Sequence, residues 1–137
     1  MVWKLYALVF DSGCFVLIWL VQLVIYPSFQ HYTALNLKAW HRKYTKLISF
    51  VVLPLMLGQL LFGIIGAFDF EYLNLIKLVL ILATWATTFI LFVPLHNKVE
   101  KGKNLKEIAA ALVYKNWIRT GLWSLVFFLS IAQNLIP

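Results

Sequence analysis

Four long apolar runs, separated by polar stretches, dominate the sequence. They cover residues 5–26, 47–68, 75–95 and 117–136. Each run has the ~20 residues that an α-helix, rising 1.5 Å per residue, needs to cross about 30 Å of hydrocarbon. We therefore expect an all-α protein in which residues 1–137 form a single domain, an integral membrane bundle of four transmembrane helices.

Helix signals refine the ends of these runs. Pro27 predicts the end of the first helix and a short loop, because proline lacks an N–H and restricts the residue before it. The second helix is then expected to begin near Lys38. Pro54 predicts a kink within it, with Gln59 available to satisfy the freed carbonyl group. Asn104 stands where the N-cap of a helix leading into the fourth run is expected.

The first run is not typical of a cleaved signal peptide. It is much longer than the apolar region of such a peptide, and no small-residue cleavage site follows it. Cys14 follows Asp11, Ser12 and Gly13, which superficially resembles a lipoprotein cleavage box. Asp11 occupies the position where that box needs an aliphatic residue, so we interpret Cys14 as an ordinary small apolar residue.

The basic residues are distributed unevenly between the two sides of the predicted bundle. Ten of the twelve lie in or beside the first and third connections, namely Lys38, Arg42, Lys43, Lys46, Lys98, Lys101, Lys103, Lys106, Lys115 and Arg119. Lys4 and Lys77 lie on the other side. Because positive residues are enriched in cytoplasmic loops, we expect residues 27–46 and 96–116 to be cytoplasmic and both termini to lie on the outer side.

Composition supports this class. The chain is 63% hydrophobic and 12% charged, whereas an average soluble domain has about 45–50% apolar and about 25% charged residues. The net charge of +7 would suggest nucleic acid in a soluble protein. Here the basic residues flank apolar segments, so we exclude nucleic-acid binding and expect the lipid bilayer as the partner.

Polar and aromatic residues recur at helical spacing near the cytoplasmic ends of the spans. In the fourth span Asn116, Arg119, Thr120 and Trp123 stand at i, i+3, i+4 and i+7 and therefore share one face. Such a face normally points into the bundle, because exposing polar groups to lipid costs several kcal/mol. We therefore predict a cytoplasmic-side cavity with aromatic walls.

We assign candidate roles within this cavity by residue chemistry. The candidates for catalysis or proton transfer are His41, His96 and Arg119. The candidates for binding a cofactor or substrate are Gln22, Tyr26, Tyr44, Trp85, Asn116 and Trp123. The candidates for a metal site are His41, His96 and Glu100, since His96 and Glu100 stand at i, i+4 and imidazole is a common metal ligand. Arg119 and Trp123, also at i, i+4, could form a cation–π pair.

Simpler roles remain open for these residues. Tryptophan and tyrosine near span ends often form interfacial belts, and Arg119 could extend to lipid phosphates. A histidine at a span end can equally hydrogen-bond within the protein or to a headgroup. Asp11, an ionisable residue inside the first span, is a candidate functional group, with pairing to Lys77, Gln59 or Gln133 as its structural alternative.

The order of several motifs resembles a group of small four-span bacterial membrane proteins of unknown function. The matching stretches are Gln22-Leu-Val-Ile-Tyr26-Pro27-Ser-Phe29, Trp40-His41-Arg42-Lys-Tyr44, Leu53-Pro54-Leu-Met, Trp85-Ala-Thr87-Thr88, Val93-Pro94-Leu-His96 and Asn116-Trp117-Ile-Arg119-Thr120-Gly-Leu-Trp123. More distantly, Pro94, His96, Asn97, Trp117 and Arg119 are similar to the pattern of the family that includes the fungal anthrone oxygenases. The resemblance implies a bacterial inner membrane location and a membrane oxidoreductase as one activity.

Three classes of function follow from these patterns. In the leading hypothesis the cavity binds a metal, a haem-like or quinone-like cofactor, or an amphipathic substrate, with redox chemistry as one option. The alternative is a non-catalytic accessory subunit or assembly factor that packs against itself or a larger membrane complex. The third class is an ion pathway from Asp11 to the histidines, which would need a continuous polar line.

Overall fold

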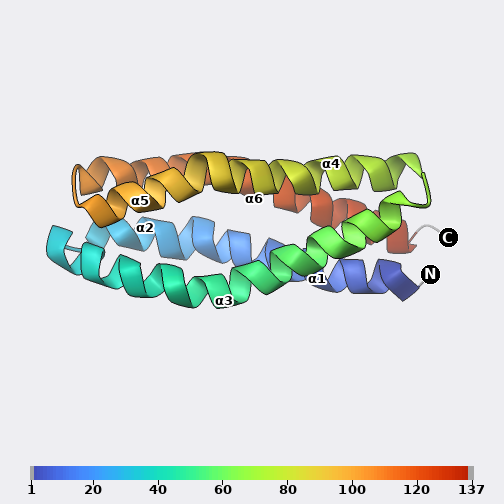
Figure 1. The fold of residues 1–137 in the computed structure, drawn as a ribbon, viewed down its shortest axis with the longest axis horizontal. Helices are drawn as coiled ribbons and strands as arrows, with labels where there is room; N and C mark the ends of the chain where they lie inside the picture. The colour runs from blue at the N-terminus through green and yellow to red at the C-terminus, as the bar shows by residue number, and fades with distance from the viewer. Residues whose placement is uncertain (1, 136–137) are drawn as a thin grey trace.

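The chain folds as four helical rods, as the computed structural model of residues 2–135 shows (Figure 1). In chain order the elements are α1 (Val2–Leu20), η1 (Val21–Ile25), α2 (Tyr26–Ser28), η2 (Phe29–His31), α3 (Ala34–Ala67), α4 (Tyr72–Thr87), η3 (Thr88–Phe92), α5 (Val93–Lys101) and α6 (Leu105–Leu135). Here η1 and η3 are π-helical and η2 is a 3₁₀ turn. The predicted all-α class is confirmed for these residues.

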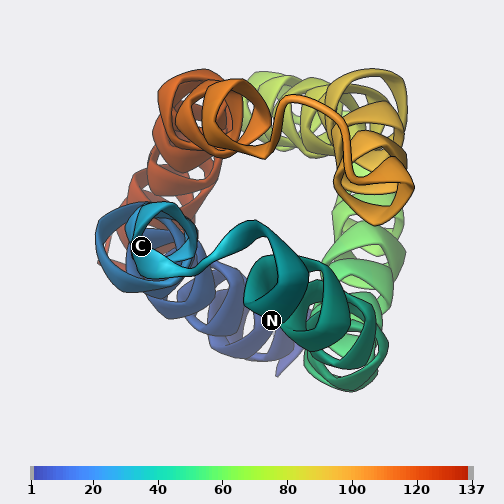
Figure 2. The ribbon, with the colours of Figure 1, turned by 90° about the vertical axis from the view of Figure 1, so that its left-hand side faces the viewer.

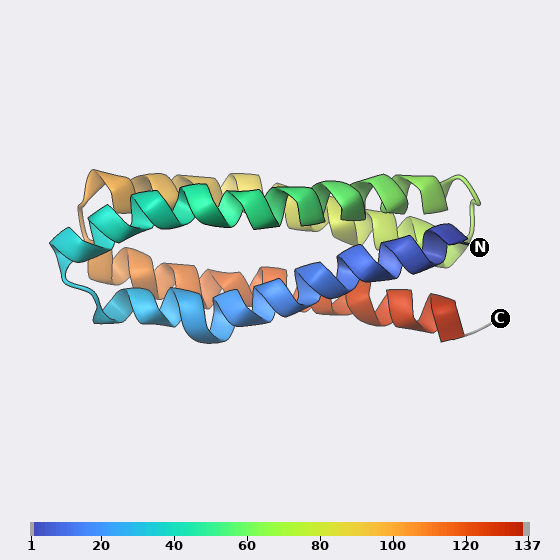
Figure 3. The same ribbon diagram turned by 90° about the horizontal axis from the view of Figure 1, so that it is seen from below.

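The rods stand at the corners of a square when the bundle is viewed along its axis (Figure 2). The rod that begins with α1 contacts α3 and α6, and the rod that begins with α4 contacts the same two helices. The start of α1, the end of α6 and the α3–α4 turn lie at one end of the bundle (Figures 1 and 3). The η2–α3 and α5–α6 connections lie at the other end, so the two predicted cytoplasmic connections share an end.

Three of the four rods are long and apolar enough to cross a membrane. These rods are Val2–His31, Ala34–Ala67 and Tyr72–Lys101. The fourth, α6, has 31 residues and contains most of the predicted span 117–136, of which residue 136 lies outside the described residues. It is the more polar rod, because Arg119, Ser130 and Gln133 are buried along it.

Pro27 does not end the first helix, contrary to the sequence-based prediction. The chain continues through α2 and η2 to His31. Proline normally breaks a helix because its ring clashes with the carbonyl four residues earlier and it has no N–H to donate. Directly before Pro27 the Tyr26 N–H donates to the Val21 carbonyl five residues back. This wider π turn makes room for the ring, and Pro94 follows the π-helical η3 in the same way.

The second rod begins at Ala34, four residues before the predicted start at Lys38. Thr33 caps this helix, because its side-chain oxygen accepts a hydrogen bond from the Asn36 N–H at 3.4 Å. The helix then continues through Pro54 as one element. The predicted loop after the first rod is therefore much shorter than expected.

The last connection agrees with the sequence. Gly102 ends α5 with a φ of 74°, a left-handed conformation that glycine adopts without strain. The final helix begins at Leu105, directly after Asn104, whose carbonyl accepts from the Ile108 N–H at 3.0 Å. The start of the helix is as predicted, but Asn104 has a φ of 51° and not the extended backbone of an N-cap residue.

Small residues allow the rods to approach closely. A Cβ atom at Gly66 would lie 2.7 Å from the Trp3 ring, and one at Gly58 would overlap the Phe10 ring. Both contacts join α1 and α3. Close approach through small residues is typical of helices that pack without help from the hydrophobic effect, as in lipid.

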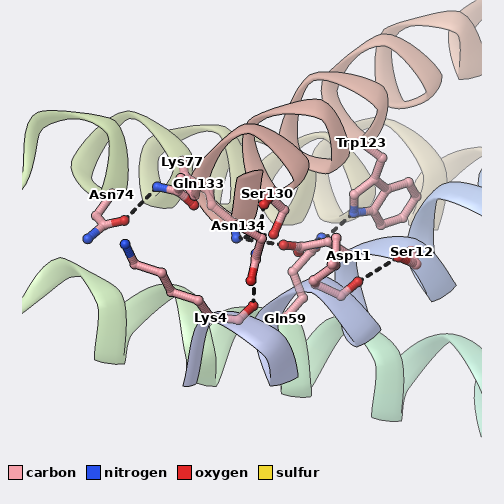
Figure 4. Close-up of polar contacts among 11 residues, drawn as sticks. Lys4, Asp11, Ser12, Gln59, Asn74, Lys77, Trp123, Ser130, Gln133 and Asn134 are labelled. Carbon is pink, nitrogen blue, oxygen red and sulfur yellow. Dashed lines mark hydrogen bonds and ion pairs between the residues drawn. The ribbon is translucent and has the colours of Figure 1, made fainter. Parts of the chain in front are cut away.

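A buried ion pair ties the rods together at the end that holds the termini. The Lys77 ammonium lies 2.6 Å from the Asp11 carboxylate, and both side chains are almost completely buried. Gln59 donates to the other carboxylate oxygen at 2.8 Å, and Lys77 donates to the Ser130 hydroxyl at 2.8 Å (Figure 4). One residue comes from each of α1, α3, α4 and α6, so the structural alternative for Asp11 is confirmed for Lys77 and Gln59.

The other predicted partners have different contacts. Gln133 donates to the Asn74 side chain at 2.6 Å and so is not a partner of the ion pair. The Gln59 side chain makes other contacts than the predicted one to the carbonyl freed at Pro54. Its amide nitrogen donates to Asp11, and its oxygen accepts from the Trp123 indole at 2.9 Å. These contacts add cross-links between helices.

We expect Asp11→Asn to destabilise the bundle by about 3–5 kcal/mol, because it leaves the Lys77 charge buried without a partner. Thermal or denaturant unfolding of the detergent-solubilised protein measures this loss. The double variant D11N/K77M removes both charges and should recover most of the stability. Asp69→Asn, at an exposed position, is the matched control, and a D11N protein as stable as this control would contradict the prediction.

Candidate functional site

A cavity of about 340 Å³ lies inside the half of the bundle nearer to the η2–α3 and α5–α6 connections. All four rods contribute to its wall. Its apolar part includes Met56, Trp85 and Trp123, and polar groups of Tyr26 and Arg119 also face it. Pockets that enclose small molecules have this composition, with an apolar wall and a few fixed polar groups.

Arg119 brings a buried positive charge to the cavity wall. The residue is only 7% exposed, and hydrogen bonds and aromatic rings within the bundle hold its side chain. Its Nε donates to Asn116 at 3.0 Å, and its two terminal nitrogens donate to Thr88 at 3.5 Å and Tyr26 at 3.4 Å. The guanidinium carbon lies 3.8 Å from the centre of the Phe92 ring. In residues 2–135 no carboxylate lies within ion-pair distance of this group.

The predicted cation–π pair of Arg119 and Trp123 is present. The guanidinium carbon lies 5.5 Å from the Trp123 ring centre, within the distance at which the ring face attracts a cation. Phe92 is closer still, so two aromatic rings contact the same charge. This environment stabilises a cation without neutralising it.

Gln22 and Asn116 form a second layer behind the arginine. The Asn116 amide donates to Gln22 Oε1 at 2.9 Å, and the Thr120 hydroxyl lies 3.2 Å from the same oxygen. Gln22 in turn donates to the Val113 carbonyl at 3.2 Å. These residues do not line the cavity, and the geometry makes them positioning residues that orient Arg119.

The two candidate histidines contact each other. His41 Nε2 and His96 Nδ1 are 2.7 Å apart, and His96 Nε2 lies 3.1 Å from the Tyr26 hydroxyl. His96 and Tyr26 line the cavity, whereas His41 is completely buried behind His96. A chain of hydrogen bonds therefore runs from Arg119 through Tyr26 and His96 to His41.

Arginine sets the direction of this chain, because a guanidinium group can only donate. The Tyr26 oxygen accepts from Arg119, and the one acceptor within reach of its own proton in the described residues is His96 Nε2. Neutral His96 then carries its proton on Nδ1 and donates to His41. The reverse direction would leave the buried Tyr26 proton without an acceptor, whereas His41 Nδ1 has no partner among the described residues in either direction.

The predicted metal ligands are not assembled as a set. In residues 2–135 no three His, Cys, Asp or Glu side chains are grouped so that they could hold one metal ion. His41 and His96 direct ring nitrogens at each other, and Glu100 lines the cavity together with His96. The polar groups that line the cavity include hydrogen-bonding side chains and the buried charge of Arg119.

Most of the predicted site residues meet around one space. Six of the nine predicted catalytic and cofactor-binding residues line the cavity, namely Tyr26, Tyr44, Trp85, His96, Arg119 and Trp123. Gln22, His41 and Asn116 lie one layer behind them. His31 is exposed and does not take part. Thr88 and Phe92 were not among the candidates, although their four-residue spacing from each other and from His96 is a signal for a shared face.

Searches of protein-family models, of curated proteins and of solved structures found no match to this chain.

We expect the neutral form of His96 to carry its proton on Nδ1, with Nε2 as an acceptor. Nitrogen-15 NMR of the imidazole rings distinguishes the two tautomers, and the variants H31Q and H41Q assign the signals, because the chain has three histidines. In Tyr26→Phe the preference should be lost, since the donor to Nε2 is removed. A protonated Nε2 on neutral His96 in the unmodified protein would contradict the proposed direction.

Proposed function

We propose that this protein is an integral membrane bundle whose cavity binds a small molecule through an anionic or carbonyl head group at Arg119. The observation that carries the proposal is the buried guanidinium group without a carboxylate partner. An unpaired buried charge costs several kcal/mol, so a fold that keeps one has a use for it. An arginine presents a planar fork that matches a carboxylate or carbonyl group.

Comparison with Lys77 supports this interpretation. Both cations are buried between the same four rods, yet Lys77 is paired with Asp11 whereas Arg119 has neutral partners only. Three of its five N–H groups are used, two of them in long bonds, so two remain for a ligand. The Trp85 side chain also lines the cavity.

The apolar outer surface supports a membrane location. Phe50 and Ile90 are 71% and 70% exposed on the outside of α3 and η3, where water would be unfavourable and lipid would not. We place the η2–α3 and α5–α6 connections on the cytoplasmic side, because they carry most of the basic residues. Four crossings with the termini on the outer side follow from this placement. The resemblance to small four-span bacterial proteins is the reason for proposing a bacterial inner membrane.

The test compares ligands that share a ten-carbon chain and differ in head group, namely decanoate, decanol and decyltrimethylammonium. In lipid nanodiscs we expect decanoate to bind most tightly. Arg119→Gln should weaken decanoate binding roughly ten- to hundredfold, since a hydrogen bond to a charged group contributes about 1.5–3 kcal/mol. Decanol binding should change much less. Arg119→Lys keeps the charge but loses the fork, and should give an intermediate value.

Arg42→Gln, which removes an exposed charge from the same end of the bundle, is the matched control and should leave binding unchanged. Unfolding of each variant without ligand shows whether the fold survives. We expect R119Q to remain close to the unmodified protein, because loss of the unpaired charge offsets its lost hydrogen bonds. Equal binding of decanoate by the R119Q variant and the control would overturn the proposal and favour the accessory-subunit alternative.

A further inference from the structure

The cavity opens to the outside between α3 and the η3–α5 segment. Of the residues that line it, those exposed on the surface come from these elements alone, including Leu53 at 48%, Phe89 at 56% and Val93 at 43%. The lining residues from α1 and α6, such as Ile18 and Trp123, are buried or half buried. We call the opening bordered by Leu53, Phe89 and Val93 the side window.

The surroundings of the side window are apolar toward the middle of the bundle, whereas the exposed Ser49 and Asn97 continue the opening toward the basic connections. Phe50 and Val51 on α3 and Ile90 on η3 are exposed large hydrophobic residues that flank it. Both rods are apolar enough to cross a membrane. In the proposed membrane location the window therefore faces hydrocarbon, and molecules that reach it come from the bilayer.

The cavity wall changes polarity along the bundle axis. Toward the basic connections it is lined by Thr45, Ser49, His96, Asn97 and Glu100, and toward the middle of the bundle by Leu17, Met56, Trp85 and Trp123. Arg119 lies at the boundary between these parts. This order is that of a bilayer leaflet, where head groups lie outermost and chains lie deeper.

The charges near the cavity favour an acidic head group. Arg119 is the buried charge on the wall, and Glu100, half buried on the outer part, is the one carboxylate on it. The two are not within ion-pair distance. The exposed lysines and arginines of the two connections surround this end of the bundle, for example Lys38, Arg42 and Lys98, and raise the local concentration of anions.

We propose that the ligand is an acidic amphiphile with a single hydrocarbon chain, which enters sideways from the bilayer through the side window. Its head group contacts Arg119, and its chain lies along Met56 and Trp85 or extends through the window into lipid. A volume of about 340 Å³, near the lower end for pockets that enclose drug-sized ligands, accommodates one chain and not two. This inference rests on the proposed function and specifies its ligand and route.

The test fills the side window and compares long and short carboxylates. Val93→Trp and Leu53→Trp add bulk at the opening. Ile90→Trp is the control, because Ile90 is exposed on the neighbouring η3 segment but does not line the cavity. The probes are palmitate supplied in the nanodisc lipid and butyrate supplied in the buffer.

We expect V93W and L53W to slow palmitate binding at least tenfold. Butyrate binding at Arg119 should be unchanged, because a short acid can enter from the buffer beside the exposed polar residues Ser49 and Asn97, which also line the cavity. I90W should bind both acids like the unmodified protein. Loss of both acids in R119Q confirms that they use the proposed head-group site. If R119Q retains both acids, the proposed function itself fails.

Two results would overturn the window while leaving the proposed function intact. One is palmitate binding by V93W and L53W at the rate of I90W, because the ligand would then enter from the polar end. The other is equal slowing of palmitate and butyrate, because the substitutions would then act on the site and not on the route.

Discussion

The balance of buried charge is the constraint on which the structure depends. Two cations and one carboxylate lie fully inside an apolar bundle, and the carboxylate of Asp11 pairs with Lys77. Arg119 is left with neutral hydrogen-bond acceptors and two aromatic rings. The paired charges cross-link all four rods, whereas the unpaired charge lies on the cavity wall. The contacts that stabilise the fold and the proposed binding site therefore lie at different levels of the same bundle.

The fold could be predicted well because its signals are long and periodic. Four apolar runs give four rods, and the face that carries Asn116, Arg119 and Trp123 does point inward. The sequence left two roles for Asp11, a functional group or a residue paired with Lys77, Gln59 or Gln133. In the structure it pairs with Lys77 and accepts from Gln59. A sequence indicates that a buried carboxylate needs a partner, but it does not indicate which of several candidates lies at the same depth.

The details of the site depend on backbone geometry that local signals do not reveal. Regular α-helical spacing cannot show that His41 lies behind His96 and not beside it on the cavity wall. The prediction that Pro27 ends its helix was wrong because it took the preceding turn to be α-helical. The side window also has no sequence signal, since it arises where two rods separate and the residues on its border are ordinary apolar ones.

The two π-helical turns determine which way the residues beyond them face, separately from the packing of the helices before them. Each holds one residue more than an α-helical turn, and Tyr26 and Phe92 stand at their ends with ring centres 6.2 Å apart. Deleting one residue from either turn would restore a regular helix and rotate everything beyond it by about 100°. Tyr26 or His96 would then face away from Arg119, while the apolar core before the turn would stay in place. In descendants of this sequence, single-residue insertions and deletions could therefore create or remove the proposed binding site without a change of fold.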